Sequence, residues 1–292
     1  MPDLRATFKL LLVFLLFGFS LSAREREDWL REDVCFLSDS LNFTRRGGDC
    51  EGTLLYAERR LRDAGLRTRV TAFRTPEGRV GHNVEALLQG KGSKYIVVMA
   101  HADGLYTGDG LWYPGADANA SGVAALLELA RTLGSGTLQR NLLFVVLDGH
   151  HSSLSGASTL LSALRERGIG PSSVSMVINL DTVGSNLAPP SKGWKSYLIA
   201  LGGSRWQEAI ESCNDGLSLR LYYDYYDSRA FTDMFYRRVG DQAPFVEAGY
   251  RCVMFTSGIT FNTNKRTDLP ETLNYGLLAR RVELIARWIH KI

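Results

Sequence analysis

Several histidines and aspartates in this chain stand at places where a site could be built from them. His101 and Asp103 follow the apolar run Ile96–Ala100, which is typical of a strand buried on both faces. His150 and His151 come after a second apolar run, and Asp181 ends a third. Imidazole nitrogens and carboxylate oxygens bind zinc, and the same groups act as general acids and bases. These residues therefore indicate acid–base or metal chemistry.

The elements that would position these residues alternate along the chain. Strands are predicted at 68–73, 83–88, 96–100, 142–147, 175–180, 197–201, 217–223 and 251–255, and helices at 24–41, 52–64, 121–133, 154–167, 204–213 and 273–289. This alternation predicts an α/β three-layer sandwich, with a mostly parallel mixed sheet flanked by helices. Ligands of open α/β sheets bind at the carboxyl ends of the strands, where His101 and Asp103 lie.

The composition limits the class of protein. Of the 292 residues, 45% are hydrophobic, and no linker or repeat divides residues 24–292, so we expect one domain with a full core. The formal net charge is +3, and no basic run is interleaved with aromatic residues. Nucleic acid is therefore not an expected partner. The oligomeric state stays open.

Residues 1–23 have the pattern of a signal peptide. Arg5 and Lys9 form a charged start, Leu10–Phe19 an apolar stretch, and Ser20–Ala23 a cleavage zone of small residues. The apolar stretch is too short to cross a bilayer, which takes about 20 residues. We therefore expect a secreted or periplasmic protein with no membrane span after cleavage.

Export makes the four cysteines relevant. Cys35 and Cys50 flank a polar segment and could close a short loop, which would stabilise the fold by about 3 kcal/mol. Cys213 and Cys252 stand in a helical and an apolar strand segment, where buried free thiols are common. The absence of a CxxC pair argues against a zinc ribbon or a redox motif. The pairing of the four stays open.

Eight separated sequence blocks carry a family resemblance. They are GHNVEALLQG, AHAD, GADANASG, LLFVVLDGHHSSLSGAS, INLD, APFVEAG, VMFTSG and PETLNY. In this order they resemble the zinc exopeptidases related to aminopeptidase Y, bacterial leucyl aminopeptidases and glutaminyl cyclases, metallopeptidase family twenty-eight. The likeness covers nearly all of the chain from about Cys35. It implies the family's phosphorylase/hydrolase-like fold and two zinc ions at five ligand positions, with a glutamate as general base.

Two of the five ligand positions match this pattern. The resemblance implies that His101 is the first ligand, with Asp103 orienting its imidazole from behind. It also implies that Asp181 is the fourth ligand. The bridging carboxylate should stand three residues before Ser121, which is Ala118, and a methyl group cannot bind zinc. Asp117, one residue earlier, is a candidate substitute.

The remaining positions are replaced by other polar residues. His150 and His151 stand where the family has two adjacent glutamates, so that His150 is a candidate base and His151 a candidate metal ligand. Two hydrogen-bonded loop histidines without a metal are the plain alternative. Asn264 takes the place of the fifth ligand, a histidine, and an amide is a poor zinc ligand. A two-zinc centre is therefore not expected.

Three functions follow from these substitutions. The first is a catalytically impaired or inactive homologue, a pseudo-peptidase that binds a peptide, another small ligand or a partner in the old active-site cleft. The second is a single-metal metallohydrolase or transferase, with one zinc ion on His101, His151 and Asp181, Asp117 as a further ligand candidate and His150 as base. The third is an ordinary two-zinc aminopeptidase, which requires ligands at positions other than those aligned above.

Overall fold

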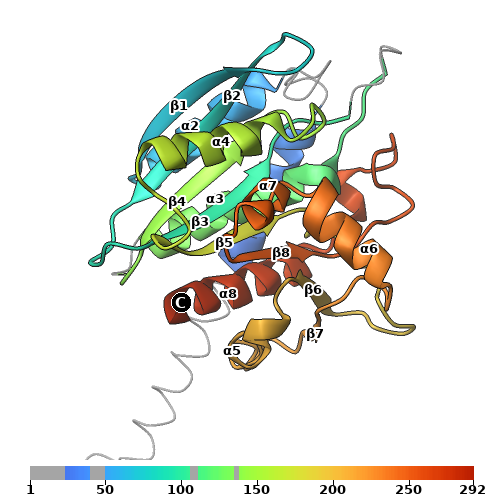
Figure 1. The fold of residues 1–292 in the computed structure, drawn as a ribbon. Helices are drawn as coiled ribbons and strands as arrows, with labels where there is room; N and C mark the ends of the chain where they lie inside the picture. Colours follow the sequence, from blue (N-terminus) through green and yellow to red (C-terminus); the bar gives the residue numbers. More distant parts are fainter. Residues whose placement is uncertain (1–23, 40–49, 106–110, 135–137) are drawn as a thin grey trace, which may run out of the picture.

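The computed structural model describes residues 24–39, 50–105, 111–134 and 138–292, so that the expected signal segment 1–23 lies outside the described residues. Eight strands form one sheet in the order β1-β2-β4-β3-β5-β8-β6-β7 (Figure 1). They are β1 Arg67–Arg74, β2 Val80–Leu88, β3 Tyr95–His101, β4 Asn141–Leu147, β5 Val174–Leu180, β6 Tyr197–Leu201, β7 Arg220–Tyr222 and β8 Cys252–Thr256. The pairings β3–β4, β3–β5, β5–β8 and β6–β7 are parallel, and β1–β2, β2–β4 and β6–β8 are antiparallel. The predicted mixed sheet is confirmed.

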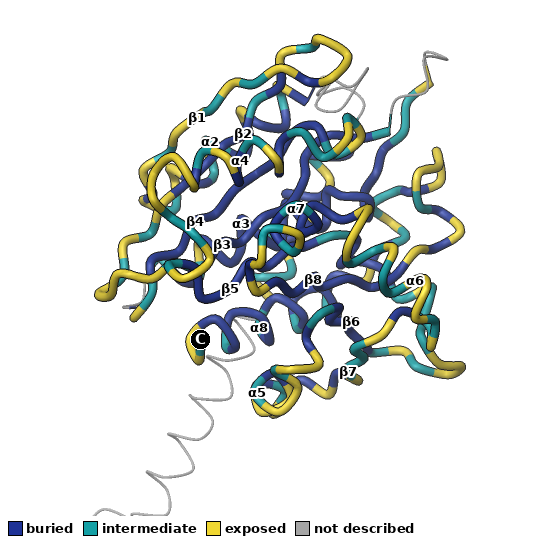
Figure 2. Tube along the Cα trace, viewed as in Figure 1, coloured by how far each residue is buried: buried dark blue, intermediate teal, exposed yellow. Residues whose placement is uncertain are grey.

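Helices cover both faces of this sheet. The helix of residues 24–38, α2 (Glu51–Asp63), α3 (Ser121–Gly134) and α8 (Tyr275–Lys291) share one core with it. The opposite core contains α4 (Ser155–Glu166) and α7 (Ala243–Glu247). Successive residues of β3 alternate between the two, because Ile96 and Val98 pack in the first and Val97 and Met99 in the second. Figure 2 shows the central strands buried between the helices. The three-layer α/β fold is confirmed.

The structure differs from the predicted elements at the β6–β8 end of the chain. Residues 204–213, predicted as one helix, form a short 3₁₀ turn followed by α5 (Gln207–Glu211). The strand predicted at 217–223 shortens to β7. The short helices α6 (Arg229–Met234) and α7 were not predicted, because segments of five or six residues are too short to display a helical period.

The structure also bears on the expectations for the cysteines and for membrane-spanning segments. All four cysteines are free thiols, so the Cys35–Cys50 bridge is not formed; Cys50 is buried and Cys35 is exposed. The expected burial of Cys213 and Cys252 is confirmed. Within the part of the chain that the structure describes, no helix is long and apolar enough to cross a membrane.

Gly122 marks a close approach of α3 to β5. A Cβ at this position would overlap the side chain of Asn119 and the carbonyl oxygen of Leu180. We expect Gly122→Ala to lower the free energy of unfolding by about 2 kcal/mol, as overpacking of a core does. Urea unfolding of both proteins measures the loss. Gly170→Ala is the control, since nothing lies within 4 Å of a Cβ there, and an equal loss in this variant would contradict the explanation.

Candidate functional site

The strand ends bring the predicted site residues together. His101 is the last residue of β3, Asp181 follows β5 directly, and the two histidines at 150 and 151 follow β4 after a short turn. Because β3 is parallel to both β4 and β5, these three ends lie at the same edge of the sheet. There they line a pocket of about 90 Å³ together with Ala118 and Asn264.

Asn119 joins the strand ends that carry these residues. Its side chain is fully buried, and its amide nitrogen donates to the carbonyl oxygen of Leu180 at 2.9 Å and of His101 at 3.4 Å. Its Oδ1 accepts the backbone N–H groups of Gly122 at 3.1 Å and of Thr182 at 3.0 Å. One side chain therefore holds the ends of β3 and β5 against the start of α3. Sequence reasoning did not single it out.

The imidazoles of the site lie against one another. The His101 and His150 rings are stacked with their centroids 4.0 Å apart, and the His151 ring is perpendicular to both, at 5.8 Å and 5.0 Å. On the far side of the His101 ring, Nε2 lies 3.8 Å from Oδ1 of Asp181. Burial by itself would raise the pKa of Asp181, but the neighbouring imidazoles hold that pKa below its usual value.

Asp103 contacts all three histidines of this group, through its backbone carbonyl oxygen and its carboxylate. Its backbone carbonyl oxygen lies 3.0 Å from Nδ1 of His101. Its carboxylate accepts the backbone N–H groups of His150 at 3.0 Å and of His151 at 2.9 Å, which fixes the turn after β4. Burial would raise the pKa of Asp103, yet the three surrounding histidines keep that pKa below the usual value. The carboxylate therefore stays charged.

His150 has a partner that sequence reasoning missed. Its Nδ1 lies 2.9 Å from Oδ2 of Asp241, a fully buried residue in the turn between α6 and α7. Burial alone would lower the pKa of His150, but the attraction of Asp241 outweighs it and raises that pKa to about 10. The only sequence signal was position, because Asp241 stands two residues before the APFVEAG block. The other carboxylate oxygen of Asp241 has no hydrogen-bond partner among the described residues.

Asp117, the candidate substitute for the bridging ligand, has its carboxylate engaged elsewhere. Oδ1 accepts from the Ser121 hydroxyl at 2.9 Å and from the backbone N–H of Gly184 at 2.7 Å. Burial, with a contribution from the nearby carboxylate of Asp268, raises the pKa of Asp117 to about 7. Asp117 is not among the residues that line the pocket, whereas its neighbour Ala118 is.

Three of the described residues could hold a metal ion between them. His101, His150 and Asp241 each offer a ligand atom, and these atoms lie within 4.8 Å of one another. Three protein ligands are the usual set of a catalytic zinc ion. Oδ1 of Asp241 is the oxygen that this residue can offer without losing its contact with His150, which is made by Oδ2. Ala118, where the resemblance implies a bridging carboxylate, offers only a methyl group to the pocket, and Asn264 offers an exposed amide.

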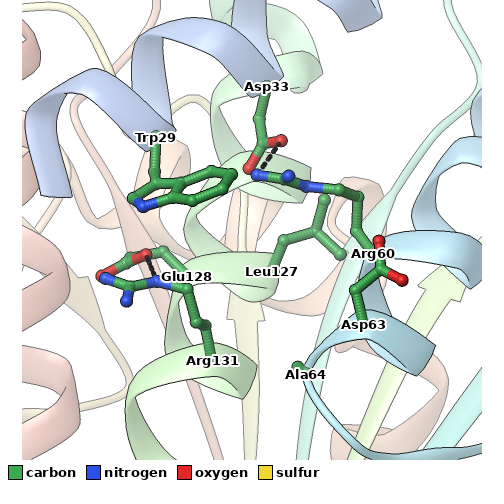
Figure 3. A pocket seen from close by; sticks show the side chains of 8 residues that line it. All are labelled: Trp29, Asp33, Arg60, Asp63, Ala64, Leu127, Glu128 and Arg131. Carbon is green, nitrogen blue, oxygen red and sulfur yellow. Dashed lines mark hydrogen bonds and ion pairs between the residues drawn. The ribbon is translucent and has the colours of Figure 1, made fainter. Parts of the chain in front are cut away.

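A second pocket, of about 190 Å³, lies away from the histidines (Figure 3). It is enclosed by the helix of residues 24–38, α2 and α3. Arg60 pairs with buried Asp33 at 2.9 Å and Arg131 pairs with buried Glu128 at 2.8 Å. Both guanidinium groups lie near the Trp29 ring, 4.3 Å and 5.9 Å from its centroid. The Arg60–Asp33 pair therefore joins α2 to the helix of residues 24–38, whereas Arg131 and Glu128 pair within α3.

Asp33 makes stability depend on pH. Burial raises its pKa from 3.8 to about 6, against the opposing effects of the Tyr56 hydroxyl and Arg60. Because the folded pKa is the higher one, this residue's contribution to stability is complete below about pH 4 and is lost as the pH rises through 6. At 1.36 kcal/mol per unit, the loss is about 2 to 3 kcal/mol. We expect Asp33→Asn to remove this difference, measured by urea unfolding at pH 4 and pH 7. An unchanged pH dependence in the variant would refute it.

Comparison with known proteins agrees with this fold. The model of peptidase family M28 matches residues 83–289. A probable zinc metalloprotease of Pyricularia oryzae is 30% identical over 251 residues, which cover 70% of this chain and 49% of the relative. The chain thus spans about half the length of the curated relatives it matches.

Solved structures support the same fold. The LapA aminopeptidase of Legionella pneumophila superposes with a TM-score of 0.72 at 16% identity, covering 92% of this chain and 72% of that one. The glutaminyl cyclase of Porphyromonas gingivalis superposes with a TM-score of 0.69 at 18% identity, covering 91% and 98%. The resemblance stated from the sequence blocks is confirmed. The chain belongs to peptidase family M28.

Proposed function

We propose that this chain is a catalytically impaired member of peptidase family M28, a pseudo-peptidase that binds a peptide or a similar small ligand in its cleft. The observation that carries the proposal is the side chain of Ala118, which lines the pocket where the resemblance expects a metal-bridging carboxylate. A bridging ligand touches both ions, so its loss weakens both metal positions. The pocket itself remains, with aromatic and polar residues such as Tyr225 and Thr256 around it.

The histidine at the base position supports the same proposal. A glutamate there would take a proton from a metal-bound water. His150 instead directs one ring nitrogen to Asp241 and stacks the face of its ring on His101. His150 therefore differs from the glutamate that two-metal hydrolysis requires, both in its chemical group and in its orientation. Recognition of a ligand needs only the shape and the polar groups of the pocket.

A single-metal hydrolase is the second candidate. The observation in its favour is the convergence of His101, His150 and Asp241. This set differs from the one predicted from the sequence, which used His151 and Asp181 beside His101. A metal ion on these donors would act as a Lewis acid toward a carbonyl group in the pocket.

Metal content and hydrolysis of aminoacyl-p-nitroanilides by the purified protein test these candidates. For a pseudo-peptidase we expect hydrolysis at the level of the uncatalysed reaction, with and without added zinc, and saturable binding of short peptides by calorimetry. Substantial zinc-dependent hydrolysis would overturn the proposal. One equivalent of metal that is lost in His101→Ala and Asp241→Asn would favour the second candidate. His290→Ala, an exposed histidine on α8, is the matched control.

A further inference from the structure

Exposed apolar side chains gather beside the site pocket. Eleven large hydrophobic residues are exposed in the described part of the chain, and five of them fall in two short segments. Phe231, Met234 and Val239 are 50%, 37% and 41% exposed in the segment 229–239, which contains α6. Ile259 and Phe261 are 44% and 69% exposed in the loop after β8. A concentration of this kind marks an interaction surface more often than scattered apolar residues do.

The two segments form one surface at the mouth of the pocket. Phe235 and Val239 from the first segment line the pocket together with Ile259 from the second. Tyr225 connects them, because its hydroxyl accepts the backbone N–H of Ile259 at 2.8 Å and its ring stacks on Phe235 at 4.5 Å. We call residues 229–239 and 259–266 the rim. The rim therefore borders the pocket.

The rim is also strongly basic. It has one carboxylate, Asp233, against five basic residues, Arg229, Arg237, Arg238, Lys265 and Arg266, all of them exposed. Asp233 lies within 3.9 Å of Arg229 and 3.3 Å of Arg237, so that it is already engaged. The whole chain has a formal charge of only +3. Positive charge is therefore concentrated at this surface, which favours an acidic partner.

We propose that the rim binds the part of a polypeptide ligand that extends from the pocket, and that this part combines apolar side chains with carboxylates. The inference rests on the proposed function, since the cleft must accept the end of the same polypeptide. Apolar groups of the ligand would cover Phe231 and Phe261, and its carboxylates would lie against the arginines. A flat anionic membrane could bind the same basic residues, but unlike a peptide it could not also extend into the pocket.

Fluorescence anisotropy with labelled peptides tests the proposal. Three ten-residue peptides share one N-terminal tripeptide and continue with apolar residues alternating with aspartate, apolar residues alternating with lysine, or serine alternating with aspartate. We expect the first to bind at least about 10-fold more tightly than the other two, a difference of about 1.4 kcal/mol. Salt should weaken the binding of the first peptide, because the contacts are exposed charges.

Variants of the rim identify the surface. We expect a loss of about 10-fold or more in affinity for the acidic apolar peptide in Arg237→Glu/Arg238→Glu and in Phe261→Ser. A second charge variant, Lys265→Glu/Arg266→Glu, covers the case in which the first one unfolds. Arg62→Glu is the control, an exposed arginine on α2 that is not part of the rim. An equal loss in this control would overturn the assignment.

The tripeptide alone separates failure of the rim from failure of the pocket. If it binds as tightly as the acidic apolar peptide, the rim proposal is wrong and the cleft proposal stands. If only the long peptide binds, the rim binds acidic apolar polypeptides without help from the pocket, so that the cleft proposal fails and, with it, the part of the rim proposal that places the end of the ligand in the pocket. If neither binds, both are wrong. Binding to vesicles containing phosphatidylserine that is lost in the rim variants, without peptide binding, would overturn the rim proposal in favour of a membrane surface.

Discussion

Asn119→Leu is expected to lower the free energy of unfolding by about 4 kcal/mol. The leucine has a similar volume, but it leaves four buried backbone groups without the partner that Asn119 provides: the carbonyls of His101 and Leu180 and the N–H groups of Gly122 and Thr182. Each buried backbone group left without a hydrogen bond costs about 1 to 3 kcal/mol, and partial relaxation reduces the sum. Urea unfolding monitored by circular dichroism measures the loss.

Gln139→Leu is the matched control for this prediction. Gln139 is an exposed amide residue outside the left-handed region of the backbone, so replacing its side chain by leucine should alter the free energy of unfolding by less than about 0.5 kcal/mol. Hydrogen exchange gives a second measurement, because the amide of Thr182 should lose protection in Asn119→Leu. Equal stabilities of the two variants would show that the hydrogen bonds of Asn119 do not hold the strand ends.

The parts of the fold with long apolar runs could be predicted from the sequence. The strand β6 has the predicted bounds. The strand predicted at 96–100 is one residue shorter than β3 at each end, and the strand predicted at 175–180 begins one residue later than β5. Burial on both faces makes such strands continuous apolar runs, which need no tertiary information to be recognised. The helices α6 and α7 are set by the contacts of the chain around Tyr236 and Phe245, and their short segments show no period.

Some contacts of the site could also be predicted from the sequence, and others could not. Parallel strands end at one edge, so the meeting of His101 and Asp181 could be anticipated from the positions of the strands. The pairing of His150 with Asp241 joins residues 91 positions apart, and it depends on how the loop before α7 returns to the sheet. No local pattern contains that information. Asp117 shows the opposite failure. Its position one residue before Ala118 suggested that it would reach the pocket, but its carboxylate accepts a hydrogen bond from Ser121 instead.

The largest effect on metal binding is expected from restoring the family's ligand set. The four positions Ala118, His150, His151 and Asn264 line the same pocket as His101 and Asp181. New ligand side chains at these positions would therefore share one pocket. We expect the variant Ala118→Asp/His150→Glu/His151→Glu/Asn264→His to bind zinc about 1,000-fold more tightly than the original protein, a gain of about 4 kcal/mol. A restored bridging carboxylate serves both ions at once, so the stoichiometry should approach two.

Competition with a zinc-binding dye and elemental analysis measure this gain. Adding Asp181→Ala to the fourfold variant should abolish most of it, which distinguishes a rebuilt centre from unspecific binding by new carboxylates. The glutamate that His150→Glu introduces would stand beside Asp241, and two carboxylates this close cannot both ionise, so a fifth change, Asp241→Asn, should strengthen zinc binding further. If the fourfold variant binds no more zinc than the original chain, the substitutions at these positions do not explain the catalytic impairment that we propose for this chain. The cause would then lie in the packing of the strand ends that Asn119 and Asp103 hold in place.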